Sequence, residues 1–428
     1  MFYFTKETGR CNMGKRILFL AVAFLLLCSP VFAAGEIKVG SINDLTGATS
    51  DVGKDMALGI RECVAYINDH GGINGKKLKL LLYDYGYRVP EAITIYKRYR
   101  DYDKIAMLSQ WGTGDTEALS PTINRDKMVA LSDSFSGHLC DPKKTPYNFV
   151  YGTDYSTNAR ACLTVWYEKV WKSPKWEKAR KAGKKPKLVC FYMFSSPYAS
   201  APIKAIKDQA KLLGMEVGKD QDVSLVALDA KSQVLGAKKE EPTVIWHGNT
   251  TMSVATAVKD GYALKLGADH IVNNWGFDQN LVRLTGKAGE GVIGAAACAF
   301  YGMDVPMMKT VVEYTKKINP GVPQDKRDIR TVQAWVKFGM IRDALAIADK
   351  KGQLNGPSIK AAFETFRDWQ PYGKKGALGR PPVTYTATDH RPSAVSMVYW
   401  IKDGKIQLLE KIDMKKKFAD KWASWLGW

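Results

Sequence analysis

Residues 37–83 read IKVGSINDLTGATSDVGKDMALGIRECVAYINDHGGINGKKLKLLLY, and this stretch determines the expected fold class. Residues 37–42 form a short apolar run that predicts a strand. A helix should follow, because four apolar residues recur at 3-4-3 spacing before a glycine pair that ends it: Ala57, Ile60, Val64 and Ile67. Residues 79–83 predict a second strand. A strand, a helix and a strand of these lengths are typical of a parallel βαβ unit.

The same alternation continues in two successive runs, separated by a loop at residues 140–146. The first run adds a helix at 92–102 and strands at 105–109 and 128–132. The second run has strands at 188–194 and 243–247, with helices at 203–213 and 254–264. The last third predicts a strand at 291–299, helices at 307–318, 330–350 and 358–366, and a hairpin of 393–401 with 406–411. Two runs of βα units predict an α/β protein with two doubly wound parallel-sheet lobes.

The N-terminus has the pattern of a secretory signal peptide. Lys15 and Arg16 precede an apolar run at 17–27, and small residues follow at Ala33 and Ala34. We therefore expect residues 1–34 to be removed on export, with Met13 as an alternative start. Cys28 lacks the small residues that usually precede a lipidated cysteine, which argues against a lipoprotein. No later segment is long and apolar enough to cross a membrane, so we expect the mature chain to be soluble and exported.

The composition is that of a globular protein with an unusual charge. Apolar residues make up 46% and charged residues 25% of the 428 residues, whereas the formal net charge is +20. A run of lysines and arginines at 169–187 faces a single acid, Glu177. We interpret this run as a solvated surface extension and expect no nucleic-acid partner. A positive surface also attracts anionic solutes or lipid headgroups.

The C-terminal segment has two interpretations. Residues 415–428 are basic and place Trp422, Trp425 and Trp428 at helical spacing. Packing of these rings against a lobe is favoured over a helix that lies on a membrane surface.

The cysteines and histidines do not indicate a metal site or a cofactor. Five cysteines follow the signal segment: Cys63, Cys140, Cys162, Cys190 and Cys298. In an oxidising compartment Cys140 and Cys162 are the pair that we expect to form a disulfide, and the others are interpreted as core thiols. Their spacing matches no zinc motif.

The chain also lacks the common catalytic motifs. It contains no Gly-x-Ser-x-Gly elbow, no His-Glu-x-x-His and no phosphate-binding loop ending in Gly-Lys-Ser/Thr. An acid-base pair of His247 with Asn249 or Asp278 is the weaker alternative. We therefore expect a binding protein that performs no chemistry and has no catalytic residue.

Several short motifs resemble those of a known family. They are Ile37-Lys38-Val39-Gly40, Leu45-Thr46-Gly47, residues 53–59, Gly71-Gly72-Ile73-Asn74-Gly75, Asp389-His390-Arg391-Pro392 and Lys402-Asp403-Gly404-Lys405. From residue 36 onward the chain resembles the branched-chain amino-acid-binding (leucine/isoleucine/valine-type) family of ABC transporter periplasmic solute-binding proteins, which have the type I periplasmic binding protein fold. The early disulfide of that family is absent, because residues 84–86 and 111–112 contain no cysteine.

The resemblance implies the domain organisation and the partners. Two lobes are joined by three crossover segments, with 35–154 and 280–382 in lobe 1 and 155–279 and 383–428 in lobe 2. A small molecule binds in the cleft between them and the lobes close on it. A monomer would then deliver the ligand to ABC permease subunits in the inner membrane. A ligand sensor of the same fold is the alternative.

The first-lobe part of the predicted site lies at two strand ends. Trp111, Gly112, Thr113 and Gly114 stand between a strand and a helix, where free backbone amides form an anion-binding corner. By resemblance this corner holds a ligand carboxylate. The loop after the next strand contributes Asp133, Ser134, Phe135 and Ser136, which the resemblance places at the second carboxylate-binding loop.

The second-lobe part departs from the family pattern. Tyr155 and Tyr198 stand where ligand-lining residues are expected, but Thr250 and Trp275 replace the tyrosine and the acid that serve a ligand ammonium. A buried ammonium without an anion is costly, so the usual amino-acid site is incomplete. The aromatic residues favour a flat or apolar ligand with a carboxylate or an amide. Alternatively, Asp133 replaces the missing acid and restores ammonium binding.

Overall fold

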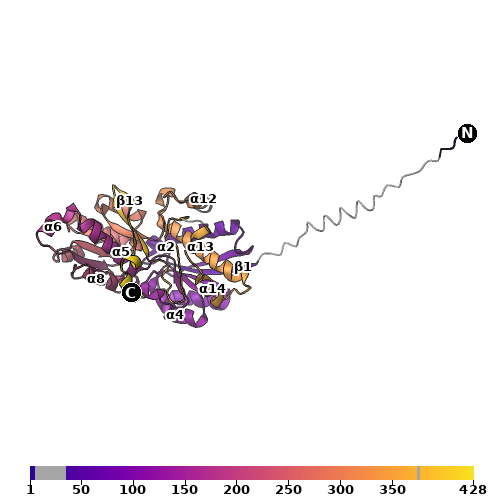
Figure 1. The fold of residues 1–428 in the computed structure, drawn as a ribbon, viewed down its shortest axis with the longest axis horizontal. Coiled ribbons are helices and arrows are strands. Elements are labelled where there is room, and N and C mark those ends of the chain that lie inside the picture. Colours follow the sequence, from indigo (N-terminus) through magenta and orange to yellow (C-terminus); the bar gives the residue numbers. More distant parts are fainter. Residues whose placement is uncertain (5–34, 374–375) are drawn as a thin grey trace.

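The chain forms two α/β lobes that lie side by side, as Figure 1 shows. The computed structural model describes residues 1–4, 35–373 and 376–428. Most of the predicted signal peptide, residues 5–34, lies outside the described residues, so this prediction stays untested. Within the described residues no helix is long and apolar enough to span a bilayer.

The first lobe is built on a parallel five-stranded sheet in the order β2-β1-β3-β4-β5. Its strands are β1 (Glu36–Asn43), β2 (Lys77–Asp84), β3 (Met107–Gln110), β4 (Ala130–Ser132) and β5 (Asn148–Val150). Its helices include α2 (Ser50–Asp69), α3 (Val89–Arg98), α4 (Thr113–Asp126), α12 (Met308–Ile318), α13 (Ile329–Lys350) and α14 (Gly356–Phe363). The predicted strands and helices of this lobe are all present, with ends that differ by a few residues.

The two longest helices of this lobe, α2 and α13, pack closely against each other (Figure 1). A Cβ atom at Gly59 of α2 would lie 2.8 Å from the Cβ of Ala334 and 2.9 Å from the backbone of Thr331. Glycine is therefore needed at this crossing, which brings the first turn of α13 toward the centre of the molecule.

The second lobe has an eight-stranded sheet in the order β13-β12-β11-β10-β9-β6-β7, with β8 also paired to β6. Its strands are β6 (Lys187–Tyr192), β7 (Glu216–Val217), β8 (Gln221–Asp222), β9 (Val244–His247), β10 (Asp269–Val272), β11 (Ile293–Ala296), β12 (Val395–Lys402) and β13 (Lys405–Asp413). Strands β12 and β13 form the predicted hairpin, and Asp403 and Gly404 adopt positive φ at its turn. The two sheets confirm the predicted fold class.

The basic run belongs to a short helical segment of the second lobe. The other helices of this lobe include α5 (Tyr155–Trp166), α7 (Pro197–Ser200), α8 (Ile203–Leu212), α9 (Lys231–Lys238), α10 (Thr251–Ala263) and α11 (Gln279–Thr285). The basic run continues α5 through Trp171 into α6 (Glu177–Lys181). Trp171 and Trp176 pack against the core, and Lys175 pairs with Asp269. Most lysines of the run are exposed, so it is an anchored surface extension.

Two predicted lobe boundaries were wrong. Strand β11 pairs with β10 and β12, so the chain returns to the first lobe after Ala296 and not at 280. The last crossover also comes later than 383, because Val383 bridges Trp369 and the His390 ring contacts the carbonyl of Asn148 in the first lobe. The strands themselves were predicted, but sequence spacing does not say which sheet a strand joins.

The predicted disulfide between Cys140 and Cys162 was also wrong. All five described cysteines have free thiols and are buried. Cys140 packs in the hydrophobic core that contains β5, whereas Cys162 packs in the separate core of the second lobe. Burial raises the pKa of both thiols above the ordinary value.

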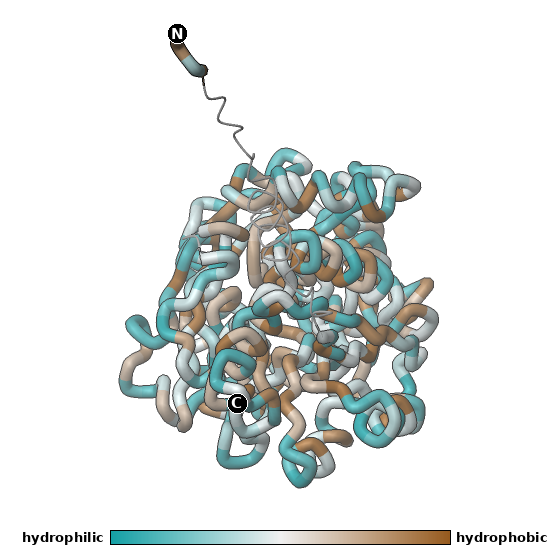
Figure 2. The backbone as a smooth tube through the Cα atoms, turned by 90° about the vertical axis from the view of Figure 1, so that its right-hand side faces the viewer, coloured by the Kyte–Doolittle hydropathy of each residue, from teal (hydrophilic) through white to brown (hydrophobic). Residues whose placement is uncertain are grey.

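Hydrophobic segments gather inside the molecule and hydrophilic ones along its periphery (Figure 2). The C-terminal segment follows this arrangement, because Trp422 and Trp425 pack against the core of the second lobe. The guanidinium groups of Arg391 and Arg160 stack on these rings at 3.7 and 4.2 Å from the ring centroids. The segment thus packs against a lobe, as predicted, although it is divided into short turns.

Candidate functional site

A cavity of about 260 Å³, part of it open to solvent, lies between the lobes. It is bordered by residues that follow strand ends of both sheets: Thr49, Val52, Tyr87, Trp111, Gly112, Thr113, Asp133, Tyr155, Tyr198, Thr250 and Trp275. This position is typical of ligand sites in open α/β sheets, where the loops after parallel strands meet.

The first wall is formed by the segment between β3 and α4. Gly112 stands immediately before α4, and in the described chain the amides of Thr113 and Gly114 have no hydrogen-bond partner. The Thr113 hydroxyl lies 2.6 Å from that of Ser134. The Trp111 indole donates to Thr49 at 2.9 Å, which fixes its ring at the cavity. These groups offer backbone donors and a hydroxyl to an acceptor on a ligand.

Glycine at position 112 is required by the packing behind this wall. A Cβ atom there would lie 2.3 Å from a carboxyl oxygen of Asp115 and 2.6 Å from the hydroxyl of Tyr85. Tyr85 donates to Asp115 at 2.8 Å. Burial raises the pKa of Asp115 to about 7, because the surrounding groups replace water poorly around a charged carboxylate.

The second wall is aromatic. The rings of Trp111 and Trp275 lie 5.2 Å apart at 58°, and those of Tyr155 and Tyr198 lie 5.6 Å apart at 71°. Trp275 donates its indole N–H to the Tyr155 hydroxyl at 2.9 Å. In the described chain the buried hydroxyl of Thr250 has no hydrogen-bond partner. The wall thus combines flat apolar faces with one hydroxyl that is free to bind a ligand.

Asp133 lies at the base of the cavity and is fully engaged within the protein. One carboxylate oxygen accepts from Tyr151 at 2.6 Å and the other from the Lys337 ammonium at 2.6 Å. Burial raises the pKa of Asp133 and lowers that of Lys337, and their attraction opposes both shifts. Asp133 is therefore not free to neutralise a ligand ammonium.

Four of the predicted site residues do not border the cavity. Ser134 and Phe135 lie behind it, where Ser134 contacts Thr113 and Phe135 packs 5.9 Å from Trp275. Ser136 instead contacts the His138 ring at 3.0 Å. Gly114 lies near Pro197 of the second lobe, whose Cγ would be 3.5 Å from a Cβ atom added at this glycine. The other eight predicted residues come together around the cavity.

Sequence reasoning missed three residues of the cavity. Thr49 and Val52 follow β1, and Tyr87 follows β2. The rule that places sites after parallel strands could have identified them, because both strands were predicted.

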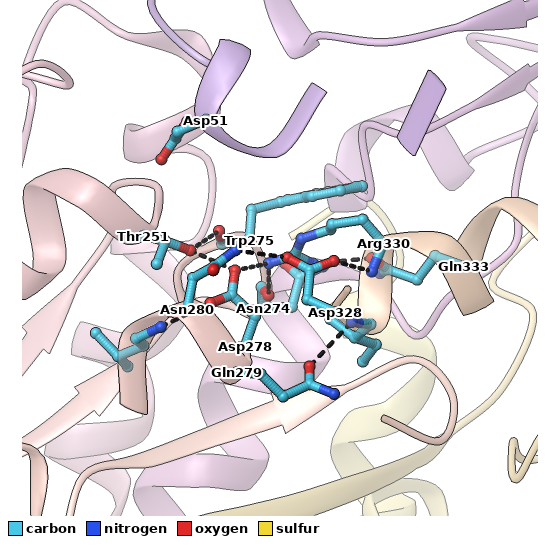
Figure 3. Close-up of polar contacts among 12 residues, drawn as sticks. Asp51, Thr251, Asn274, Trp275, Asp278, Gln279, Asn280, Asp328, Arg330 and Gln333 are labelled. Atoms are coloured by element: carbon cyan, nitrogen blue, oxygen red, sulfur yellow. Dashed lines mark hydrogen bonds and ion pairs between the residues drawn. The ribbon is translucent and has the colours of Figure 1, made fainter. Parts of the chain in front are cut away.

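The two lobes are closed on each other by a buried polar network centred on Arg330 (Figure 3). Arg330, at the start of α13 in the first lobe, donates to Asp278 of the second lobe at 3.1 Å and stacks 4.7 Å from the Trp275 ring. Thr251 donates to the same carboxylate at 2.5 Å. Asn280 adds a contact to Asp328 at 2.9 Å. Through Arg330, the network thus contacts Trp275, which borders the cavity, and it also joins the two lobes.

Comparison with known proteins agrees with this geometry. The periplasmic binding protein family model matches residues 36–405. A curated Leu/Ile/Val-binding protein of Citrobacter freundii is 19% identical over 339 residues, which are 78% of this chain and 85% of that relative. An amino acid binding protein of Pseudomonas aeruginosa is 29% identical over 119 residues, 28% of this chain. That alignment spans about a third (32%) of the relative.

Solved structures share the fold over most of their length. The substrate-binding protein of an ABC transporter from Aeropyrum pernix is 28% identical, with a TM-score of 0.78 over 89% of this chain and 96% of that one. A solute-binding protein of an ABC transporter from Rhodopseudomonas palustris, in complex with 3,4-dihydroxybenzoic acid, is 18% identical, with a TM-score of 0.70 over 89% and 98%. The resemblance read from the sequence motifs is therefore confirmed, and the chain belongs to the periplasmic binding protein family.

Proposed function

We propose that this chain is the solute-binding component of an ABC importer and binds a small, flat molecule that has a carboxylate or an amide. The central observation is the cavity between the lobes, where Trp111 faces Trp275 and the amides of Thr113 and Gly114 are unpaired. Such a site needs no catalytic group. The relatives and solved structures described above support a transport role for the family.

The polar end of the ligand is expected at the start of α4. The amides of Thr113 and Gly114 are hydrogen-bond donors, and the positive end of the helix dipole favours a negative or strongly polar acceptor. The Thr250 hydroxyl is the complementary group on the second lobe. A carboxylate or a primary amide supplies oxygen atoms for both sides of the cleft.

The flat part of the ligand is expected against the aromatic wall. Trp111 packs on Trp275 and Tyr155 packs on Tyr198, so a ligand ring would stack on, or lie edge-on to, the faces and edges that these pairs leave toward the cavity. The Rhodopseudomonas palustris protein that was solved with 3,4-dihydroxybenzoic acid shows that this fold can hold an aromatic acid. We infer by analogy that an aromatic acid or amide is a suitable ligand here.

Binding is expected to proceed by closure of the lobes. A ligand that touches Thr113 on one lobe and Thr250 and Trp275 on the other favours the closed form by its differential affinity. The contacts of Arg330 with Asp278 and Trp275 then add to closure. Permease subunits would recognise this closed form.

A thermal-shift screen tests the proposal. The purified mature chain is heated with benzoate, phenylacetate, phenylacetamide, leucine or valine, one at a time. A ligand at about 100 times its Kd adds about 2.7 kcal/mol of stability, so an aromatic acid or amide should raise the melting temperature by several degrees.

A matched pair of variants tests whether the thermal shift comes from binding in the cavity. Trp275→Ala should abolish the shift because it removes one wall, whereas Tyr262→Ala, at a side chain 63% exposed, should retain it. Stabilisation by leucine or valine alone would contradict the aromatic ligand. The binding-protein role itself would be contradicted by the absence of any ligand response together with hydrolytic turnover of a tested amide.

A further inference from the structure

The ion pair of Lys337 and Asp133 is buried at the base of the cavity. The side chain of Lys337 is 0% exposed and that of Asp133 is 1% exposed. Lys337 belongs to α13, while Asp133 follows β4, so the pair joins the longest helix of the first lobe to a strand end. Burial of two charges costs more free energy than a surface pair, and such a pair is kept only with good geometry and further hydrogen bonds.

Both partners make hydrogen bonds to other groups of the first lobe. Asp133 accepts from Tyr151 with one oxygen and from Lys337 with the other. Lys337 donates a second hydrogen bond to the backbone carbonyl of Gln110 at 2.9 Å. A ligand ammonium could reach Asp133 only by displacing Lys337, which would leave a second cation buried without its partner.

No other charged side chain borders the cavity in the described part of the chain. The remaining lining residues are threonine, valine, glycine, tryptophan and tyrosine. The surrounding wall therefore offers no replacement anion for an ammonium group, whereas the unpaired amides of α4 can donate to a carboxylate or an amide oxygen.

We infer that Lys337 is a specificity-determining residue, which neutralises Asp133 and restricts the site to carboxylic acids and amides that have no amino group. This inference rests on the proposed binding function and names its ligand class. It makes the chain a binder of simple organic acids or amides that rejects zwitterionic amino acids of the same shape.

Two ligands that differ only in the α-ammonium group test the inference. Calorimetric titration of the mature wild-type chain compares phenylacetate with L-phenylglycine, which is phenylacetate with an α-ammonium group. Wild type should bind phenylacetate at least about tenfold more tightly, equivalent to about 1.4 kcal/mol. Equal or tighter binding of phenylglycine would overturn the inference while leaving the binding function intact. If no acid, amide or amino acid binds at all, the proposed function fails instead.

Variants of the ion pair separate specificity from stability. Lys337→Met frees Asp133, so the affinity ratio should shift by about tenfold or more toward phenylglycine. The matched control is Lys337→Met combined with Asp133→Asn, which has neither charge and should keep the wild-type preference. If Lys337→Met does not fold, Lys337→Gln provides the same comparison, because it removes the charge and keeps a donor near Gln110. An unchanged ratio in the folded single variant would overturn the role of Lys337.

Discussion

The carboxylate of Asp51, in the first lobe, accepts a hydrogen bond from the backbone amide of Met252, in the second lobe, at 3.1 Å. Asp51 lies in the first turn of α2, and Met252 lies in the first turn of α10. A carboxylate at a helix N-terminus is favourable, because it pairs with free amides and the helix dipole. This contact joins the lobes directly, so it exists only while they are closed.

Closure should therefore depend on pH. In the closed form burial raises the pKa of Asp51 to about 6; the hydrogen bond from the Met252 amide opposes this increase and the charge of Asp278 adds to it. In an open form the solvated carboxyl should have its ordinary pKa near 4. Between these values the closed form holds a proton that the open form has released, so closure becomes more favourable as pH falls from about 6 to 4.

The measurement is the affinity for phenylacetamide between pH 4 and pH 8, since this ligand does not change its charge. Affinity should rise by up to about fiftyfold as pH falls to 4 and should be level above pH 7. Asp51→Asn keeps an acceptor for Met252 but should lose the rise in affinity between about pH 6 and pH 4. The control Asp229→Asn changes an exposed carboxyl and should leave the profile unchanged. Identical profiles for Asp51→Asn and wild type would contradict this role.

Replacement of Arg330 should destabilise the closed protein strongly. Arg330→Met leaves the buried carboxylate of Asp278 without its cation and removes the cation from the Trp275 ring. Loss of one partner from a buried pair costs about 3–5 kcal/mol. Urea unfolding followed by tryptophan fluorescence measures the loss. Arg283→Met, at an exposed side chain nearby, should change the free energy of unfolding by less than about 0.5 kcal/mol. Similar losses in both variants would show that the Arg330 network does not contribute to the free energy of unfolding.

Gly112→Ala should damage both stability and binding. The added methyl group would lie within 2.8 Å of Asp115, Tyr85 and Tyr87, and Tyr87 borders the cavity. Overpacking of this kind costs about 1–3 kcal/mol, so affinity for phenylacetate should fall at least about fivefold. At Gly321 no atom lies within 4 Å of an added Cβ, and Gly321→Ala should bind as wild type does. Unchanged affinity in Gly112→Ala would show that the start of α4 does not contact the ligand.

The Tyr155 hydroxyl should also contribute to binding. It accepts from the Trp275 indole at 2.9 Å and donates to the backbone carbonyl of Asp133 at 3.3 Å. Tyr155→Phe leaves the indole N–H without a partner, which costs about 1–3 kcal/mol. Calorimetry should show about a tenfold loss of affinity, whereas Tyr102→Phe, at a side chain 78% exposed, should show none. A wild-type affinity in Tyr155→Phe would contradict the proposed support of Trp275.

The local structure was largely predictable, because strands and helices follow from nearby residues. The apolar run at 37–42 and the 3-4-3 spacing of Ala57, Ile60, Val64 and Ile67 correspond to β1 and α2. The hairpin at Asp403 and Gly404 has the turn residues that positive φ requires. The sheet of β11 was not predictable, since its pairing depends on β12, about a hundred residues later in the chain.

The site residues that directly follow a predicted strand could be identified from the sequence. Trp111 and Thr113 were found in this way, and Tyr87 could have been. Lys337 and Arg330 gave no signal, because each lies on an ordinary helix and its partner is far away in the sequence. The Cys140 and Cys162 prediction failed for the same reason, since spacing does not show that two thiols occupy different cores.

The most direct test of the account is a crystal structure of the mature chain grown with phenylacetate. We predict closed lobes with the ligand ring packed against Trp111 and Trp275 and the carboxylate within hydrogen-bond distance of the Thr113 and Gly114 amides. We also predict that the Lys337 and Asp133 pair stays intact. A closed structure with phenylacetate absent from the cavity, or bound only on the outer surface, would contradict the central claim.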